Sequence, residues 1–270
     1  MSPCWEFGNC GKNNFIYGED EVVMRNLMLL SALLILCCGC GKKESDNTRL
    51  NNAVKEFANG DFAKAESLID AVLKNNPDNS SARLLQALKY EKEGDLDKAL
   101  DIASAVSAEY PDSFVALYTK GRLQAQMPLH RRNAYETLTE ANLREPSNVS
   151  TLILLCNLGT ELKYKNVLQH INQLKKHPEY ANNNVLNYQL GKCLLLHGKR
   201  PEALAALKSA VNGLSDFGLL FNIARTIDSN NLDRKYAVRL YTVYSATSAG
   251  RKNPAAREYA RLRIRTLNGR

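Results

Sequence analysis

A short segment occurs twice in this chain, and its spacing restricts the fold more than any other feature. Residues 59–65 read Asn-Gly-Asp-Phe-Ala-Lys-Ala, and residues 93–99 read Glu-Gly-Asp-Leu-Asp-Lys-Ala. The dipeptide Pro77-Asp78 returns as Pro111-Asp112 with the same shift of 34 residues. A fixed period between about 20 and 50 residues indicates a solenoid, in which each repeat buries its hydrophobic face against its neighbours.

Each period is typical of two helices joined by a tight turn. In the second period, Ser80 or Ser81 is expected to cap the first helix. Gly94 suits the left-handed turn that follows a helix, and Asp95 suits the cap of the next one. Pro111 cannot continue a helix and should end it. The second helix carries apolar residues three and four positions apart, as one helix face requires: Leu96, Ala99, Leu100, Ala103 and Val106.

The glycine, alanine and proline positions recur in register, and in this the chain resembles tetratricopeptide-repeat (TPR) proteins. The resemblance implies an all-α fold: a right-handed TPR superhelix of about six helix-turn-helix units plus a C-terminal capping helix. We expect the TPR array over residues 48–251 and the capping helix within 252–270, from Pro254 to about Leu267. The expected repeats are residues 46–79, 80–113, 114–148, 149–183, 184–217 and 218–251. The third repeat lacks the turn glycine, the fourth is degenerate, and the sixth has no clear turn glycine.

An apolar segment precedes the repeats. Leu27–Leu36 is apolar apart from Ser31 and follows Arg25. A run of ten residues is too short to span a bilayer as a helix and has the length of a signal-peptide core. The sequence Cys37-Cys38-Gly39-Cys40 comes next, followed by a polar stretch. This order resembles a bacterial lipoprotein signal.

The lipoprotein resemblance implies a signal peptide over residues 24–39, lipid on Cys40, and a tether over 40–47. Cys38 is an alternative lipidation site, and an uncleaved hydrophobic N-terminus or a cleaved, unlipidated secretory signal also stays open. Gly41 resembles outer-membrane sorting. We therefore expect attachment to the periplasmic face of the outer membrane, or to the cell membrane if the source is not a double-membrane bacterium.

Residues 1–23 do not fit a signal peptide. Glu19, Asp20 and Glu21 place negative charge where such a signal carries positive charge. We expect that translation starts at Met24 and that residues 1–23 are a translated upstream extension.

The chain has a formal net charge of +8, and the basic excess lies at its C-terminal end. From Arg225 to Arg270 there are eleven basic side chains and three acidic ones, an excess of eight. Arg257, Arg261 and Arg265 stand at four-residue steps and make a basic face on the expected capping helix. This face is either a solvated cap or a contact for phospholipid headgroups or an acidic protein.

We expect no enzyme activity, no metal site and no cofactor. The four His residues are scattered without the pairing of a metal site, and there is no Gly-rich phosphate loop. Nucleic acid is not an expected partner, because a secreted lipoprotein leaves the cytoplasm. Five of the seven Cys precede residue 41. Cys156 and Cys193 lie in apolar stretches and suit buried thiols, although a bridge between them stays open.

The TPR resemblance implies protein or peptide binding on the surface formed by the first helix of each repeat. Each candidate residue could instead pack between repeats. The carboxylate clamp of TPR proteins that bind chaperones is absent, because its positions hold Leu50, Val54, Leu85, Val115 and Thr119. The candidates are Leu84, Leu88, Tyr118, Arg122, Asn157, Tyr188, Lys192 and Asn222.

The expected function is that of a membrane-anchored TPR adaptor in the bacterial cell envelope, where outer-membrane proteins or pili are assembled. The alternative is a TPR lipoprotein that captures a glycan or peptide ligand. A structural envelope protein without a discrete partner is a third interpretation. The oligomeric state is not indicated by the sequence.

Overall fold

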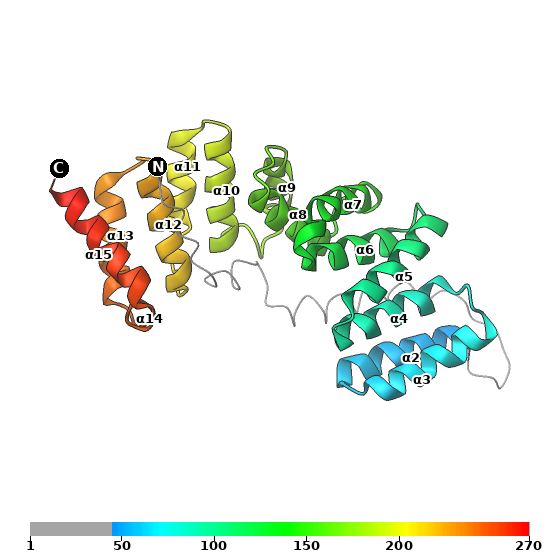
Figure 1. The fold of residues 1–270 in the computed structure, drawn as a ribbon. Coiled ribbons are helices and arrows are strands. Elements are labelled where there is room, and N and C mark those ends of the chain that lie inside the picture. The colour runs from blue at the N-terminus through cyan, green and yellow to red at the C-terminus, as the bar shows by residue number, and fades with distance from the viewer. Residues whose placement is uncertain (1–44, 270) are drawn as a thin grey trace. The chain divides into compact units, whose positions relative to one another are not determined.

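The protein is described by a computed structural model over residues 45–269, in which helices are joined by turns and short loops (Figure 1). These residues contain fourteen α-helices and one short 3-10 helix, with no strand among them. The expected all-α fold of paired helices is thus confirmed. The described residues form two compact units, 45–158 and 159–269, which are treated separately below. The expected signal peptide and lipidation site lie outside the described residues.

The first unit consists of successive helices, and those between Asp46 and Arg144 each pack on the next along the chain. Their bounds are α2 (Asp46–Asn59), α3 (Phe62–Asn75), α4 (Ser80–Glu93), α5 (Leu96–Glu109), α6 (Phe114–Gln126), α7 (Arg131–Arg144) and the greater part of α8 (Val149–Glu161). The turn of the third repeat is a 3-10 helix at Pro128–His130, in place of a glycine.

Local residue chemistry explains the turns of the first two repeats. Gly60 and Gly94 end α2 and α4 with φ of +80° and +85°, a conformation that a side chain would resist. The carboxylate of Asp95 accepts a hydrogen bond from the backbone N–H of Lys98 at 3.2 Å and caps α5. The expectation that Ser80 or Ser81 caps α4 was wrong. Asn79 has the extended backbone of a cap residue, and its side chain accepts from the N–H of Ala82 at 2.9 Å.

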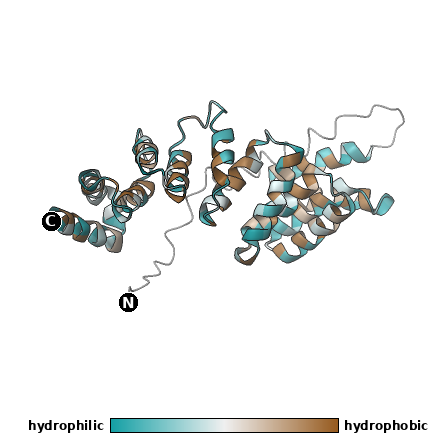
Figure 2. Cartoon of the chain, turned by 90° about the horizontal axis from the view of Figure 1, so that it is seen from above, coloured by the Kyte–Doolittle hydropathy of each residue, from teal (hydrophilic) through white to brown (hydrophobic). Residues whose placement is uncertain are grey.

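The first unit is held together by hydrophobic residues that lie where neighbouring helices face one another (Figure 2). Ala65 and Ala99, the repeat alanines of α3 and α5, are completely buried. Their small side chains let paired helices approach closely. The hydrophobic residues of one cluster come from α2, α3 and α4, and those of the other come from α4, α5 and α6.

The second unit continues the helical pairs and ends with the capping helix. Pro254 lies in the first turn of the last helix, and the side chain of Asn253 caps it by accepting from the N–H of Ala256 at 3.1 Å. The bounds are α9 (Val167–Leu174), α10 (Asn184–Leu196), α11 (Arg200–Ser209), α12 (Phe217–Ser229), α13 (Arg234–Ala246), α14 (Ser248–Lys252) and α15 (Pro254–Asn268). The short helix α14 was not expected from the sequence.

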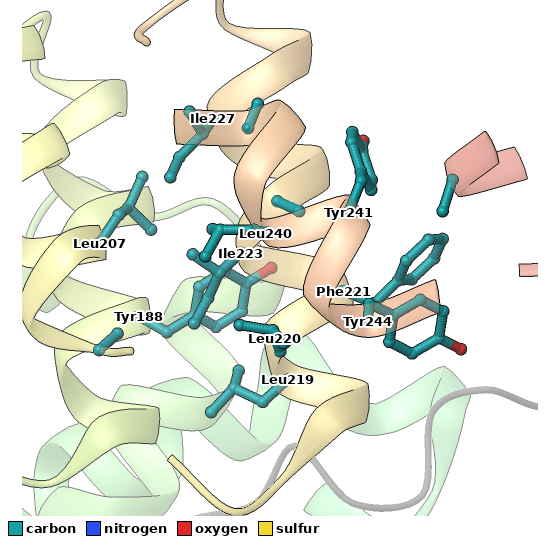
Figure 3. Close-up of a cluster of buried hydrophobic side chains, with 14 of the residues drawn as sticks. Tyr188, Leu207, Leu219, Leu220, Phe221, Ile223, Ile227, Leu240, Tyr241 and Tyr244 are labelled. Atoms are coloured by element: carbon teal, nitrogen blue, oxygen red, sulfur yellow. The ribbon is translucent and has the colours of Figure 1, made fainter. Parts of the chain in front are cut away.

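Two repeats of the second unit turn without glycine. Lys163 has φ of +60° in the fourth repeat, and Asn231 has φ of +49° in the sixth. Asparagine tolerates this conformation better than lysine does. The core of this unit is formed chiefly by α12 and α13, where Phe221 lies against Tyr244 at 4.7 Å between ring centroids (Figure 3).

Candidate functional site

The candidate binding residues all lie on the first helix of a repeat, but two of them belong to the core. Leu84 is 4% exposed and packs in the cluster that contains Ala99 and Ala116. Leu88 is 6% exposed and packs in the cluster that contains Phe57. For these two leucines the structure favours packing between repeats, the interpretation that the sequence left open.

Arg122 on α6 is engaged by a carboxylate of the preceding repeat. Its guanidinium donates to both carboxylate oxygens of Glu91 on α4, at 2.7 Å for Nη2 to Oε2, and Gln126 donates to the same carboxylate. Burial raises the pKa of the Glu91 carboxyl, but the charge and hydrogen bonds of Arg122 outweigh it and hold this pKa below its usual value. The positive charge of Arg122 is therefore balanced within the first unit.

Tyr118 and Asn157 are also largely buried. Tyr118 is 5% exposed and stacks on Phe114 with 5.7 Å between ring centroids. Asn157 on α8 is 9% exposed. Neither side chain presents much surface on the first unit.

Lys192 on α10 of the second unit differs from Arg122 in that it has no paired carboxylate among the described residues. Its ammonium lies 4.9 Å from the ring centroid of Tyr188, one helical turn earlier. Burial lowers the pKa of Lys192, and the attraction of Glu161 opposes this only in part. Among the residues that the structure describes, no carboxylate lies within the 4.0 Å of an ion pair with Lys192.

Tyr188 joins α10 to the next first helix. It is 8% exposed, and its hydroxyl lies 3.3 Å from the hydroxyl of Thr226 on α12. Asn222 stands one turn before Thr226 on the same helix and is partly exposed. Three of the candidates, Tyr188, Lys192 and Asn222, are thus brought onto two adjacent first helices of one unit.

Arg225 on α12 belongs to the same region but was missed in the sequence. Its guanidinium carbon lies 5.9 Å from the ring centroid of Phe221 and 5.6 Å from that of Tyr259 on α15. The side chain is exposed, and the structure gives it no carboxylate partner among the described residues. A helical projection from Asn222, three residues earlier, could have found it. We call Tyr188, Lys192, Asn222, Arg225 and Tyr259 the cationic face of the second unit.

The basic face of the capping helix is also present. Arg261 and Arg265 are exposed on α15, and Arg257 is partly buried. Arg263 stands between them in sequence but is turned to Asp228, to which it donates two hydrogen bonds of 2.8 Å.

Residues 45–269 contain no cluster of three or more His, Cys, Asp or Glu side chains suited to a metal ion. Over the same residues, no helix has the length and hydropathy needed to cross a membrane. Cys156 and Cys193 are buried thiols and do not form the bridge that the sequence left open. Burial raises the pKa of the Cys193 thiol, which reduces its reactivity.

Comparisons with known proteins agree with this architecture. The family model described as "Tetratricopeptide repeat" matches residues 50–114. No curated protein sequence is a significant match.

Three solved structures illustrate the shared fold. PilF of Pseudomonas aeruginosa is 13% identical, with a TM-score of 0.55 over 78% of this chain and 96% of that one. YrrB, described as a TPR protein with an unusual peptide-binding site, is 14% identical, with a TM-score of 0.55 over 66% of this chain and 91% of that one. Naa15/Naa10 bound to HypK-THB is 15% identical, with a TM-score of 0.53 over 83% of this chain and 34% of that one.

The repeat family and the fold lead to one conclusion. Residues 50–114 match the repeat model, and further helical pairs follow them along the chain. Residues 50–114 are therefore similar to the tetratricopeptide-repeat family, and the described residues share the paired-helix fold of solved TPR structures.

Proposed function

We propose that this protein is a lipid-anchored adaptor of the bacterial cell envelope, holding protein partners on the cationic face of its second unit. The anchor is lipid on Cys40, and the protein is attached to the periplasmic face of the outer membrane. Bacterial lipoproteins carry two or three acyl chains, and more than one chain is needed for durable attachment.

One observation carries the binding part of this proposal. Lys192, Asn222 and Arg225 present polar groups on two adjacent first helices, and the structure leaves the two cations without a carboxylate partner among the described residues. Aromatic rings flank both cations. Exposed polar groups beside aromatic surface are typical of protein interfaces. The corresponding arginine of the first unit, Arg122, is already balanced by Glu91.

The fold comparisons support an adaptor in general terms. YrrB has a peptide-binding site, and Naa15/Naa10 was solved bound to HypK-THB. The proposed setting, assembly of outer-membrane proteins or of pili, rests on the layout of a lipid anchor followed directly by a TPR array.

Site-specific photocrosslinking in cells tests the binding face. A photoreactive residue at Asn222 should capture a discrete partner. The same residue at Glu202, exposed on the second helix α11, is the matched control and should not capture it. Equal capture at both positions, or none at Asn222, would contradict the proposed face.

The intact mass of the protein from its own membrane fraction tests the anchor. We expect a chain that begins at Cys40 and carries acyl groups, and we expect both to be lost in a Cys40→Ser variant. An unlipidated mass for the native protein would remove the membrane from the proposal and leave the adaptor without its anchor.

The alternative of ligand capture is favoured by the peptide-binding site that YrrB is described as having. Under this alternative the cationic face holds a free peptide in place of a folded partner. The crosslink at Asn222 separates the two, because a captured protein and a captured peptide differ in mass.

A further inference from the structure

The cationic face is a continuous series of contacts across α10, α12 and α15. The Lys192 ammonium lies over the Tyr188 ring, and the Tyr188 hydroxyl lies 3.3 Å from the Thr226 hydroxyl. Arg225 precedes Thr226 by one residue and lies over the rings of Phe221 and Tyr259. These contacts place the two cations on helices that touch within a single compact unit.

The acidic residues near this face do not neutralise it. Glu161 attracts Lys192 but lies beyond ion-pair distance. Asp228 on α12 accepts two hydrogen bonds from Arg263 and one from the Tyr241 hydroxyl at 3.1 Å. Its carboxylate is 4% exposed and is occupied within the core. Lys192 and Arg225 therefore keep their charge available to a partner.

Partial burial strengthens the attraction between Lys192 and an anionic partner. Lys192 is partly buried against an aromatic ring, and Coulomb attraction is stronger where water is excluded. Asn222, three residues from Arg225, offers an amide that can donate to and accept from a peptide backbone. The partly buried ring of Tyr259 offers apolar surface beside Arg225, and the Tyr188 ring, which is 8% exposed, lies beneath the Lys192 ammonium.

We propose that the cationic face binds an acidic peptide segment whose Asp or Glu carboxylates pair with Lys192 and Arg225. This inference rests on the proposed adaptor function, since it gives the chemistry of the partner at the same face. It also assigns recognition to the second unit, because the buried arginine of the first unit already has its carboxylate in Glu91.

An anionic lipid surface is a different partner, and the geometry does not favour it at this face. Lys192 is partly buried, whereas headgroup contact suits exposed cations such as Arg261 and Arg265 on α15. Lipid binding at the cationic face is therefore an outcome that would overturn the inference.

The test is selection of a random peptide library on the purified full chain. We compare three proteins: the wild type, Lys192→Gln/Arg225→Gln, and Arg261→Gln/Arg265→Gln. The two double variants remove the same charge, so they separate the cationic face from the general basicity of the chain. Circular dichroism melts check that each protein remains folded.

The wild type should enrich peptides rich in Asp and Glu. Binding of a selected acidic peptide, measured by fluorescence anisotropy, should weaken by roughly tenfold or more in Lys192→Gln/Arg225→Gln. It should change by less than about twofold in Arg261→Gln/Arg265→Gln. Added salt should weaken the wild-type complex, because exposed charges are screened.

Three results would overturn the inference. One is enrichment of peptides without an acidic bias, which would leave the adaptor function intact and reject only the partner chemistry. Another is equal loss of binding in both double variants. The last is that the wild type selects no acidic peptide but binds phosphatidylglycerol vesicles, and that Lys192→Gln/Arg225→Gln loses this vesicle binding. The adaptor function itself is tested separately: it would be contradicted if no partner were crosslinked at Asn222.

Discussion

Arg263 on the capping helix donates two hydrogen bonds to Asp228 on α12, from Nε to Oδ2 and from Nη2 to Oδ1, each 2.8 Å long. The residues are 35 positions apart in the chain. Tyr241 on α13 donates to the same carboxylate, and the buried surroundings raise the pKa of its hydroxyl far above the ordinary value. One buried carboxylate thus joins the last repeat to the helix that caps it.

Removing Arg263 should destabilise the protein. Arg263→Ala leaves the Asp228 carboxylate buried with only the Tyr241 hydroxyl, and we expect a loss of about 2–3 kcal/mol in the free energy of unfolding. Arg261→Ala, on an exposed position of the same helix, is the control and should change it by less than about 0.5 kcal/mol. Urea unfolding curves measure both. Equal stability of the two variants would mean that the ion pair does not hold the capping helix.

The pair of Glu91 and Arg122 predicts an acid-dependent loss of stability. The pKa of Glu91 is held below its ordinary value of 4.5 in the folded protein, so its contribution is complete above about pH 4.5 and is lost as the pH falls through the folded value. Glu91→Gln should cost about 3 kcal/mol at pH 7, because Arg122 stays buried without its carboxylate. The difference from the wild type should narrow toward pH 3.

The control for this pH series is Glu93→Gln. Glu93 is on the same helix, and its exposed carboxylate lies 3.6 Å from the Lys89 ammonium. An exposed pair of this kind contributes less than about 1 kcal/mol. The assignment would fail if Glu93→Gln and Glu91→Gln gave the same pH dependence in denaturant unfolding.

The repeat alanine of α5 predicts an overpacking effect. Ala99 is completely buried between helices, and Ala99→Trp should lower the free energy of unfolding by about 1–3 kcal/mol or more. Ala63→Trp makes the same substitution at an exposed position of α3 and should be nearly neutral. Thermal unfolding of the two variants would show the contrast. An unchanged melt for Ala99→Trp would contradict the TPR register.

The turn of the fourth repeat offers a stabilising substitution. Lys163 has φ of +60°, a conformation that costs a non-glycine residue roughly 1 kcal/mol. Lys163→Gly removes this strain, but glycine has greater backbone entropy in the unfolded chain, which offsets part of the gain. The free energy of unfolding should therefore rise by about 0.5 kcal/mol. Lys163→Ala keeps a side chain at this φ and should give no gain. A loss of stability in Lys163→Gly would show that the lysine side chain has a structural role.

The repeat pattern was readable because its determinants are local. Gly60 and Gly94 permit a backbone conformation, Asp95 caps the helix that it precedes, and prolines end helices within a few residues. These effects act over one helical turn, so the chain order alone reveals them. Different residue types can also fill the same local role. Asn79 caps α4 in place of the expected serine, and Asn231 adopts the positive φ of a turn in place of glycine.

The binding candidates could not be sorted in the same way. A helical projection places Leu84, Arg122 and Lys192 on comparable faces, yet one is core, one is paired, and one is a partly buried cation without an ion pair among the described residues. The difference depends on residues from other repeats. Glu91 lies 31 positions from Arg122, and such partners are fixed only when helices pack.

The sequence by itself therefore determined the helix pairs, their glycine turns and the all-α class, because these follow from hydrogen bonds and side-chain spacing within one repeat. Only the tertiary structure decided which charges remain available. Packing placed Glu91 against Arg122, Asp228 against Arg263, and the ring of Tyr259 against Arg225. Burial and ion pairing are properties of neighbours in space, and these neighbours come from segments far apart in the chain.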